Sequence, residues 1–105
     1  MIICTIEKTN QLINKLIEFH QKTDESQLPS STDEVNSISD IGTIIVDELH
    51  MIGEENRGYL LEVTLSKLRY LMSMQKSSIQ LIAMSATLPN LREIALWLDA
   101  CLFVT

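Results

Sequence analysis

Two short apolar runs, separated by one segment with helical spacing, constrain the fold of this chain more than any other feature. The runs are IGTIIV at 41–46 and IQLIAM at 79–84, and their length and β-branched residues are typical of buried strands. Between them, Leu61, Leu65 and Leu68 recur on one face of a helix. Two strands joined through a helix lie parallel in one sheet, because the helix returns the chain to the edge where the first strand began. The sequence therefore predicts a parallel strand–helix–strand unit.

The segments on either side of this unit continue the alternation. Further strands are predicted at 1–5 and 101–105, and further helices at 7–21 and 89–98. In the last of these helices, Asn90 and Glu93 have the spacing of a capping box. Alternating strands and helices predict an α/β fold, a parallel sheet flanked by helices. Strands this apolar are expected to be buried on both faces.

Composition indicates one globular domain rather than a disordered chain. The 105 residues are 46% hydrophobic and 21% charged. Eight basic against fourteen acidic side chains give a formal net charge of −6, so other segments must supply most of the positive field for any nucleic acid. The acidic, serine-rich stretch at 23–39 is too polar to order itself, and we expect a flexible surface insertion there.

The cysteines and the first residues indicate the compartment. Cys4 and Cys101 lie in apolar runs with no CxxC partner, so we expect buried free thiols in a reducing environment. No apolar run reaches the roughly eighteen residues of a membrane span. The first residues lack the basic flank and cleavage site of a signal peptide. These features predict an intracellular protein with no membrane partner.

Charged and hydroxyl side chains follow the two central strands where each one ends. Asp47 and Glu48 come directly after TIIV, and Ser85 and Thr87 follow the second strand. Ligands of parallel sheets gather beyond the carboxyl ends of the strands. Two adjacent carboxylates repel each other unless a cation offsets their charge, and a divalent metal carrying a nucleotide triphosphate is the commonest such cation there. If the strands are neighbours, Ser85 and Thr87 reach either His50 or a phosphate-linked water, a choice that spacing leaves open.

Three segments carry a resemblance to a known family. VDELHMIG with RGYLLE resembles motif II of the superfamily-two DExH helicases, MSATLPNL resembles their motif III, and CTIEKTNQLINKLIE is similar to the segment around motif Ib. The motifs occur in the order of that family, and the nearest resemblance is to repair helicases of the polymerase theta group. It spans nearly the whole chain apart from 23–39. The resemblance implies a RecA-like (P-loop NTPase) sheet and an ATP-dependent DNA helicase that acts in DNA repair in the nucleus.

The resemblance also implies roles for individual residues. Asp47 would hold the Mg²⁺ ion of ATP through water, and Glu48 would orient and deprotonate the attacking water. His50 would couple the nucleotide site to motif III. The motif III residues that would relay the nucleotide state to strand separation are Ser85, Ala86 and Thr87.

A second group of residues would lie beside single-stranded or partly duplex DNA. In the segment similar to motif Ib, these are Thr5, Glu7 and Lys8, where the first turn of a helix offers free N–H groups to a phosphate. Arg57 and Gly58 match a family feature that shapes the loop after motif II.

The sequence contains no GxxxxGK(S/T) loop to hold the α- and β-phosphates, and its glycines are Gly42, Gly53 and Gly58. The second motor lobe, with its arginines, is absent too. We therefore expect residues 1–105 to be a fragment of the first RecA-like, ATP-binding lobe, from motif Ib to just past motif III. Such a fragment would act with the remaining motor segments of a parent chain, and by itself should neither hydrolyse ATP nor unwind DNA.

Two other function classes stay open. A catalytically inactive RecA-like interaction module, or a decayed paralogue, would keep the fold without the phosphate loop. An unrelated metal-dependent hydrolase would bind its ion directly with Asp47, Glu48 and His50.

Overall fold

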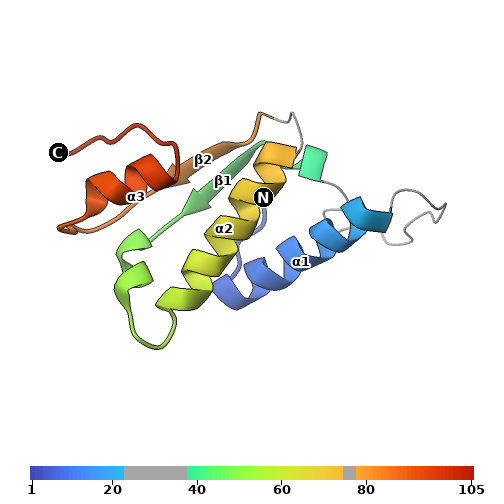
Figure 1. Ribbon diagram of the computed structural model, residues 1–105, viewed down its shortest axis with the longest axis horizontal. Helices are drawn as coiled ribbons and strands as arrows, with labels where there is room; N and C mark the ends of the chain where they lie inside the picture. The colour runs from blue at the N-terminus through green and yellow to red at the C-terminus, as the bar shows by residue number, and fades with distance from the viewer. Residues whose placement is uncertain (23–37, 75–77) are drawn as a thin grey trace.

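The computed structural model describes residues 1–22, 38–74 and 78–105. Within these ranges the chain forms three α-helices, two short 3-10 helices and two strands (Figure 1). In chain order they are α1 (Ile6–Lys22), η1 (Ile38–Asp40), β1 (Thr43–Val46), η2 (Leu49–Gly53), α2 (Gly58–Met74), β2 (Gln80–Ala83) and α3 (Leu91–Trp97). The predicted α/β fold is confirmed, and every predicted helix is present. None of the described helices is both long and apolar enough to cross a bilayer.

The strands β1 and β2 pair in parallel, as the sequence predicts. Val46 lies opposite Ala83 at the carboxyl end of the ladder. Backbone hydrogen bonds continue past the strands: the N–H of Met84 donates to the carbonyl of Val46, and the N–H of Leu49 donates to the carbonyl of Met84, both at 2.9 Å. Because parallel strands end at one edge, this register sets the residues after Val46 beside those after Ala83.

Two clusters of buried apolar side chains hold the helices on the sheet. The first joins α1, η1 and α2 through Ile13, Leu16, Ile38, Leu68 and Leu71, with Ile79 from just before β2. The second joins η2, α2 and α3 through Leu49, Leu61, Leu65, Ile94 and Leu98. The leucine face that the sequence predicts for α2 is therefore buried. Since α2 contributes to both clusters, it is the central helix of the arrangement (Figure 1).

The described helices cover one face of the sheet. Ile44 and Val46 of β1 pack against the clusters, whereas Ile45 is 64% exposed and Ile82 of β2 is 39% exposed. Successive strand residues point to opposite faces, so Ile45 and Ile82 lie on the uncovered side. The expectation that the strands are buried on both faces is therefore wrong. The apolar composition of the strands suits a sheet that is covered on both faces, but the described residues cover only one face.

The strands predicted at 1–5 and 101–105 are also wrong. Both segments are described, and both lie outside any strand or helix with their residues exposed. A strand is stabilised by hydrogen bonds to a neighbouring strand, and among the described residues β1 and β2 pair only with each other. Cys4 and Cys101 lie in these two segments, so their thiols are free, as expected, but exposed rather than buried.

Helix α3 begins after Asn90, but not through the predicted capping box. The Asn90 side chain makes no capping hydrogen bond, and its backbone carbonyl instead accepts from the N–H groups of Glu93 and Ile94 at 3.1 and 3.2 Å. At the other end, the Arg69 guanidinium of α2 donates to the carbonyl of Trp97. The position of α3 therefore depends on contacts with α2 more than on a cap of its own.

The predicted acidic insertion at 23–39 lies outside the described residues, except for Ile38 and Ser39. These two residues begin η1, and the side chain of Ile38 is buried in the first cluster. The packed part of the chain thus starts before the boundary that composition indicates.

The 105-residue chain by itself leaves apolar surface uncovered. Besides Ile45 and Ile82, an open groove of about 690 Å³ runs along β2 and is lined on its other side by residues 98–103. We predict that the isolated chain self-associates or stays molten, because an uncovered apolar strand favours pairing between molecules. Calorimetry and binding of a dye specific for exposed apolar surface measure this. A sharp cooperative melt of a monomer would contradict the prediction.

Two lysine substitutions separate the effect of the uncovered apolar face from the effect of a change in net charge. Ile45→Lys should raise the soluble fraction, because it places a charge on the uncovered face. Ser66→Lys adds the same charge at an exposed position of α2 and should leave solubility unchanged.

Candidate functional site

The acid pair lies where β1 leaves the sheet. Both Asp47 and Glu48 are exposed. The backbone of Glu48 is left-handed, with φ 57° and ψ 41°, an uncommon conformation for a residue that is not glycine. Its N–H donates to Oδ1 of Asp47 at 2.8 Å. The chain therefore turns sharply at the strand end, and strained backbone of this kind concentrates at functional sites.

His50 connects the acid pair to the segment after β2. Its Nε2 lies 2.9 Å from Oε2 of Glu48, and its Nδ1 accepts a hydrogen bond from the N–H of Ala86 at 3.1 Å. Because Nδ1 is an acceptor, it carries no proton, and the ring proton is on Nε2, from which it is donated to Glu48. The two nitrogens of one imidazole thus join the carboxylate of Glu48 to the backbone of Ala86.

An open depression of about 420 Å³ unites most of the predicted site residues. It is lined by Asp47, Glu48, His50, Met84, Ser85 and Ala86. The hydroxyl of Ser85 donates to the carbonyl of Ala86 at 2.7 Å, which fixes the turn that presents the N–H of Ala86 to His50. Thr87 is exposed and does not line the depression. The structure therefore brings together the acid pair, His50, Ser85 and Ala86, and leaves Thr87 outside.

The oxygen atoms in this depression suit a hard cation that is held mainly by the phosphates of a bound nucleotide. Among the described residues, no three His, Cys, Asp or Glu side chains form a ready metal site. His50 does not serve as a direct ligand here, since both its nitrogens are engaged. Asp47 keeps an exposed carboxylate, and Mg²⁺ is commonly bound through one or two carboxylates together with waters and substrate phosphates. The residues present therefore fit a magnesium–nucleotide complex better than a metal centre built by the protein alone.

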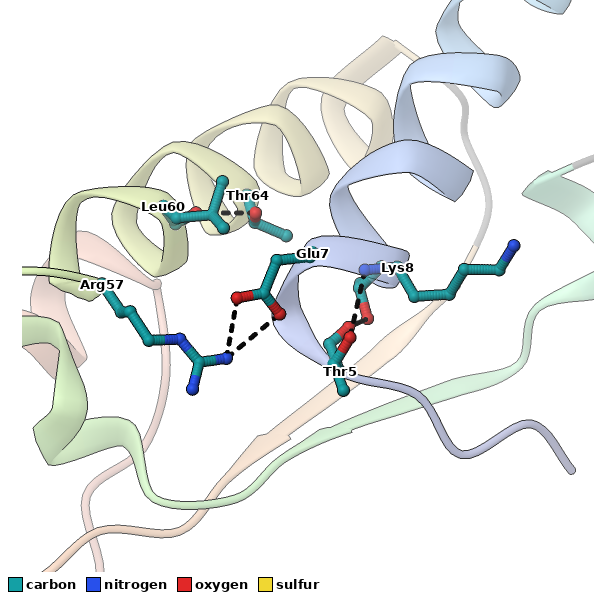
Figure 2. Close-up of polar contacts among 7 residues, drawn as sticks. Thr5, Glu7, Lys8, Arg57, Leu60 and Thr64 are labelled. Atoms are coloured by element: carbon teal, nitrogen blue, oxygen red, sulfur yellow. Dashed lines mark hydrogen bonds and ion pairs between the residues drawn. The ribbon is translucent and has the colours of Figure 1, made fainter.

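The predicted nucleic-acid residues form a second group at the start of α1. Thr5 precedes the helix, and its Oγ accepts a hydrogen bond from the N–H of Lys8 at 3.3 Å, in the manner of an N-cap. The carboxylate of Glu7 faces Arg57, whose Nη2 lies 2.9 Å from Oε1 and 3.0 Å from Oε2. Figure 2 shows that Arg57 reaches Glu7 from the loop before α2, while the side chain of Lys8 extends away from this pair.

Electrostatics favour the ionised form of Glu7. Its own backbone N–H is the main cause that holds the pKa of the Glu7 carboxyl below its ordinary value. The charge of Arg57 lowers the pKa further, while desolvation opposes both. A lowered folded-state pKa stabilises the protein above the unfolded-state pKa, and this contribution is lost as the pH falls through the folded-state value. At neutral pH the ion pair is therefore fully charged.

The sequence gives a weak signal for Arg57 and Gly58, and none for their contacts. A side chain at Gly58 would place a Cβ 2.2 Å from the carbonyl oxygen of Ile52 and 2.8 Å from its carbon. The absence of a side chain at Gly58 thus lets the start of α2 pack directly on η2. The partner of Arg57 lies fifty positions away in the chain, beyond the reach of any local pattern.

Comparison with known proteins identifies the class of this fold and site. Residues 1–94 match the profile of the DEAD/DEAH box helicase family, and the chain belongs to that family. The chain is 40% identical over 103 residues to DNA polymerase theta of Drosophila melanogaster, and 39% identical over 100 residues to the helicase POLQ-like protein of Homo sapiens. It is also 42% identical over 65 residues to the ATP-dependent DNA helicase Hel308 of Thermoplasma acidophilum. The helicase resemblance that the sequence predicts is thereby confirmed.

The chain corresponds to a small part of each relative. The matches cover 98%, 95% and 62% of the chain, in the order given above, but only 4%, 7% and 9% of the relatives. Tests of activity and stability therefore belong in a full-length helicase that contains this segment.

We predict that Gly58→Ala destabilises such a protein by about 1–3 kcal/mol, because the new methyl group meets the backbone of Ile52 and forces a local shift. The midpoint of thermal unfolding measures the change. Gly53→Ala is the matched control, since nothing lies within 4 Å of its added Cβ, and it should be neutral or slightly stabilising. Equal effects of the two substitutions would contradict the prediction.

Proposed function

We propose that this chain is part of the first, ATP-binding lobe of an ATP-dependent DNA helicase of the polymerase theta type. The complete motor would couple ATP hydrolysis to DNA strand separation or translocation in DNA repair, in the nucleus. One observation carries the proposal: the acid pair and the Ser85–Ala86 turn line a single depression and are joined by His50. The names of the relatives, a DNA polymerase theta and an ATP-dependent DNA helicase among them, support the same function.

The geometry of the acid pair supports hydrolysis of a terminal phosphate. Glu48 is the proposed base: His50 holds Oε2, which leaves Oε1 to orient a water and accept its proton. Asp47 is the proposed carboxylate that binds Mg²⁺ through water, and that ion neutralises charge on the phosphates when it is bound. In-line attack needs one placed base and charge neutralisation, and the two carboxylates divide these tasks.

Coupling is proposed to pass through the same contact. A shift of Ser85 and Ala86, with Thr87 beyond them, would move the N–H that holds Nδ1 of His50. His50 would then change its hold on Glu48. In this way, the position of the segment after β2 would control the base.

The proposed DNA contacts lie at the start of α1. Thr5, Glu7 and Lys8 would lie next to the DNA backbone, with the ammonium of Lys8 available to a phosphate. With a formal net charge of −6, the chain needs basic residues from the remaining motor segments to retain DNA. Binding of ATP likewise requires those segments, because the phosphate loop is not part of this sequence. We propose that the predicted acidic segment, without Ile38 and Ser39 of η1, forms a surface insertion in the lobe.

In the full-length helicase, we predict that Glu48→Gln lowers ATP turnover by about 10²- to 10⁴-fold while ATP binding is retained, because the amide cannot accept the proton of the attacking water. Steady-state ATPase rates and equilibrium nucleotide binding measure the two effects. Glu62→Gln, which removes a carboxylate from an exposed position of α2, is the matched control and should keep normal turnover.

The alternatives predict different results. Normal turnover of the Glu48 variant would remove this residue from the role of base. A folded full-length protein that neither binds nor hydrolyses ATP would favour the inactive interaction module.

A further inference from the structure

Resting on the helicase function proposed above, we propose that the ion pair between Arg57 and Glu7 is the positioning contact that connects the acid-pair loop to the DNA-facing start of α1. Through this ion pair, binding of DNA at the start of α1 would affect the rate of ATP hydrolysis at Glu48. Neither Arg57 nor Glu7 is a catalytic residue in this proposal. Each acts through the element that it holds.

A continuous series of backbone hydrogen bonds leads from the acid pair to Arg57. The N–H of Met51 donates to the carbonyl of Glu48 at 2.9 Å, and the N–H of Glu54 donates to the carbonyl of Met51 at 3.0 Å. The N–H of Gly58 then donates to the carbonyl of Glu54 at 2.9 Å. Successive backbone hydrogen bonds therefore connect Glu48 to Gly58, the residue that follows Arg57.

The backbone of Arg57 is fixed on its other side by α2. Its carbonyl accepts hydrogen bonds from the N–H groups of Leu60 and Leu61 at 3.1 and 3.3 Å. The next residue, Gly58, is buried and packs on the backbone of Ile52. The backbone of Arg57 thus joins the acid-pair loop to α2, and its guanidinium joins the same loop to α1.

Glu7 is the residue of α1 that the Arg57 guanidinium contacts. It lies in the first turn of α1, between Thr5, which caps the helix, and Lys8, which points away from the pair (Figure 2). A carboxylate at this position repels a phosphate unless a cation neutralises it, and Arg57 is that cation. The ion pair therefore both orients the start of α1 and makes it compatible with an anionic ligand.

The surroundings of the pair indicate a role other than stability. The side chains of Arg57 and Glu7 are 48% and 50% exposed, and exposed ion pairs contribute little to folding. Helices α1 and α2 are joined directly by a more buried contact, in which Nζ of Lys67 donates to Oδ1 of Asn10 and of Asn14, each at 2.9 Å. Substitution of Lys67 is therefore a suitable control, because it weakens the contact between α1 and α2 without touching the Arg57–Glu7 ion pair.

The test is DNA-stimulated ATP hydrolysis in the full-length helicase. We expect Arg57→Ala to keep the rate without DNA and to lower the stimulation by single-stranded DNA about fivefold or more, the range of ordinary allosteric coupling. Glu7→Gln, which removes the partner of Arg57, should also lower the stimulation by single-stranded DNA. The double variant should be no worse than either single one, because the two side chains act as a unit. Arg57→Lys should retain most of the stimulation.

Two control variants separate the proposed positioning role of Arg57 from an effect on protein stability and from the loss of a positive charge. Lys67→Met should lower the thermal midpoint and keep the stimulation. Arg92→Ala, which removes an exposed guanidinium from α3, should also keep it. Normal stimulation in Arg57→Ala, additive losses in the double variant, or equal loss in Lys67→Met would each overturn the inference. A wild-type protein without DNA-stimulated hydrolysis would instead overturn the proposed function, and the inference with it.

Discussion

The parallel pairing of β1 with β2 is the constraint on which the rest of the structure depends. Its hydrogen bonds run past Val46 and Ala83 to the bond from Leu49 to Met84, so the residues that leave the two strands remain in register. A slip of one residue would turn every strand side chain to the opposite face. It would also carry the N–H of Ala86 away from His50. The apolar core and the polar depression are thus two results of one register.

The loop from Glu48 to Gly58 joins two polar regions that lie far apart in the sequence. One end holds the acid pair and its imidazole contact, and the other end holds Arg57 against α1. Between them, η2 buries Leu49 in the second apolar cluster and packs against Gly58. The loop is thus held by polar contacts at both ends and by apolar packing in its middle. The proposed nucleotide and nucleic-acid groups are therefore arranged around one body rather than on independent segments.

Much of this arrangement can be predicted from local patterns, and the rest cannot for physical reasons. The helices and the central strands follow from periodicity, which reports on the burial of one face. Segments 1–5 and 101–105 have the composition of strands, yet a strand also requires a neighbour that composition does not reveal. The meeting of Asp47 with Ser85 follows from parallel topology alone. The contacts of His50 and Arg57 do not, because one uses a backbone N–H and the other joins residues fifty positions apart.

The left-handed backbone of Glu48 has a consequence for how its carboxylate is retained. Such a conformation costs roughly 1–3 kcal/mol for a residue with a side chain, which is comparable to one charge-assisted hydrogen bond. Rotation of the peptide unit before Glu48 would therefore lower the backbone energy, and contacts with neighbouring residues must prevent it. Asp47 and His50 supply those restraints from outside the residue. The orientation of the Glu48 carboxylate is therefore set by its neighbours, and loss of either contact would remove a restraint on a backbone conformation that is unfavourable by itself.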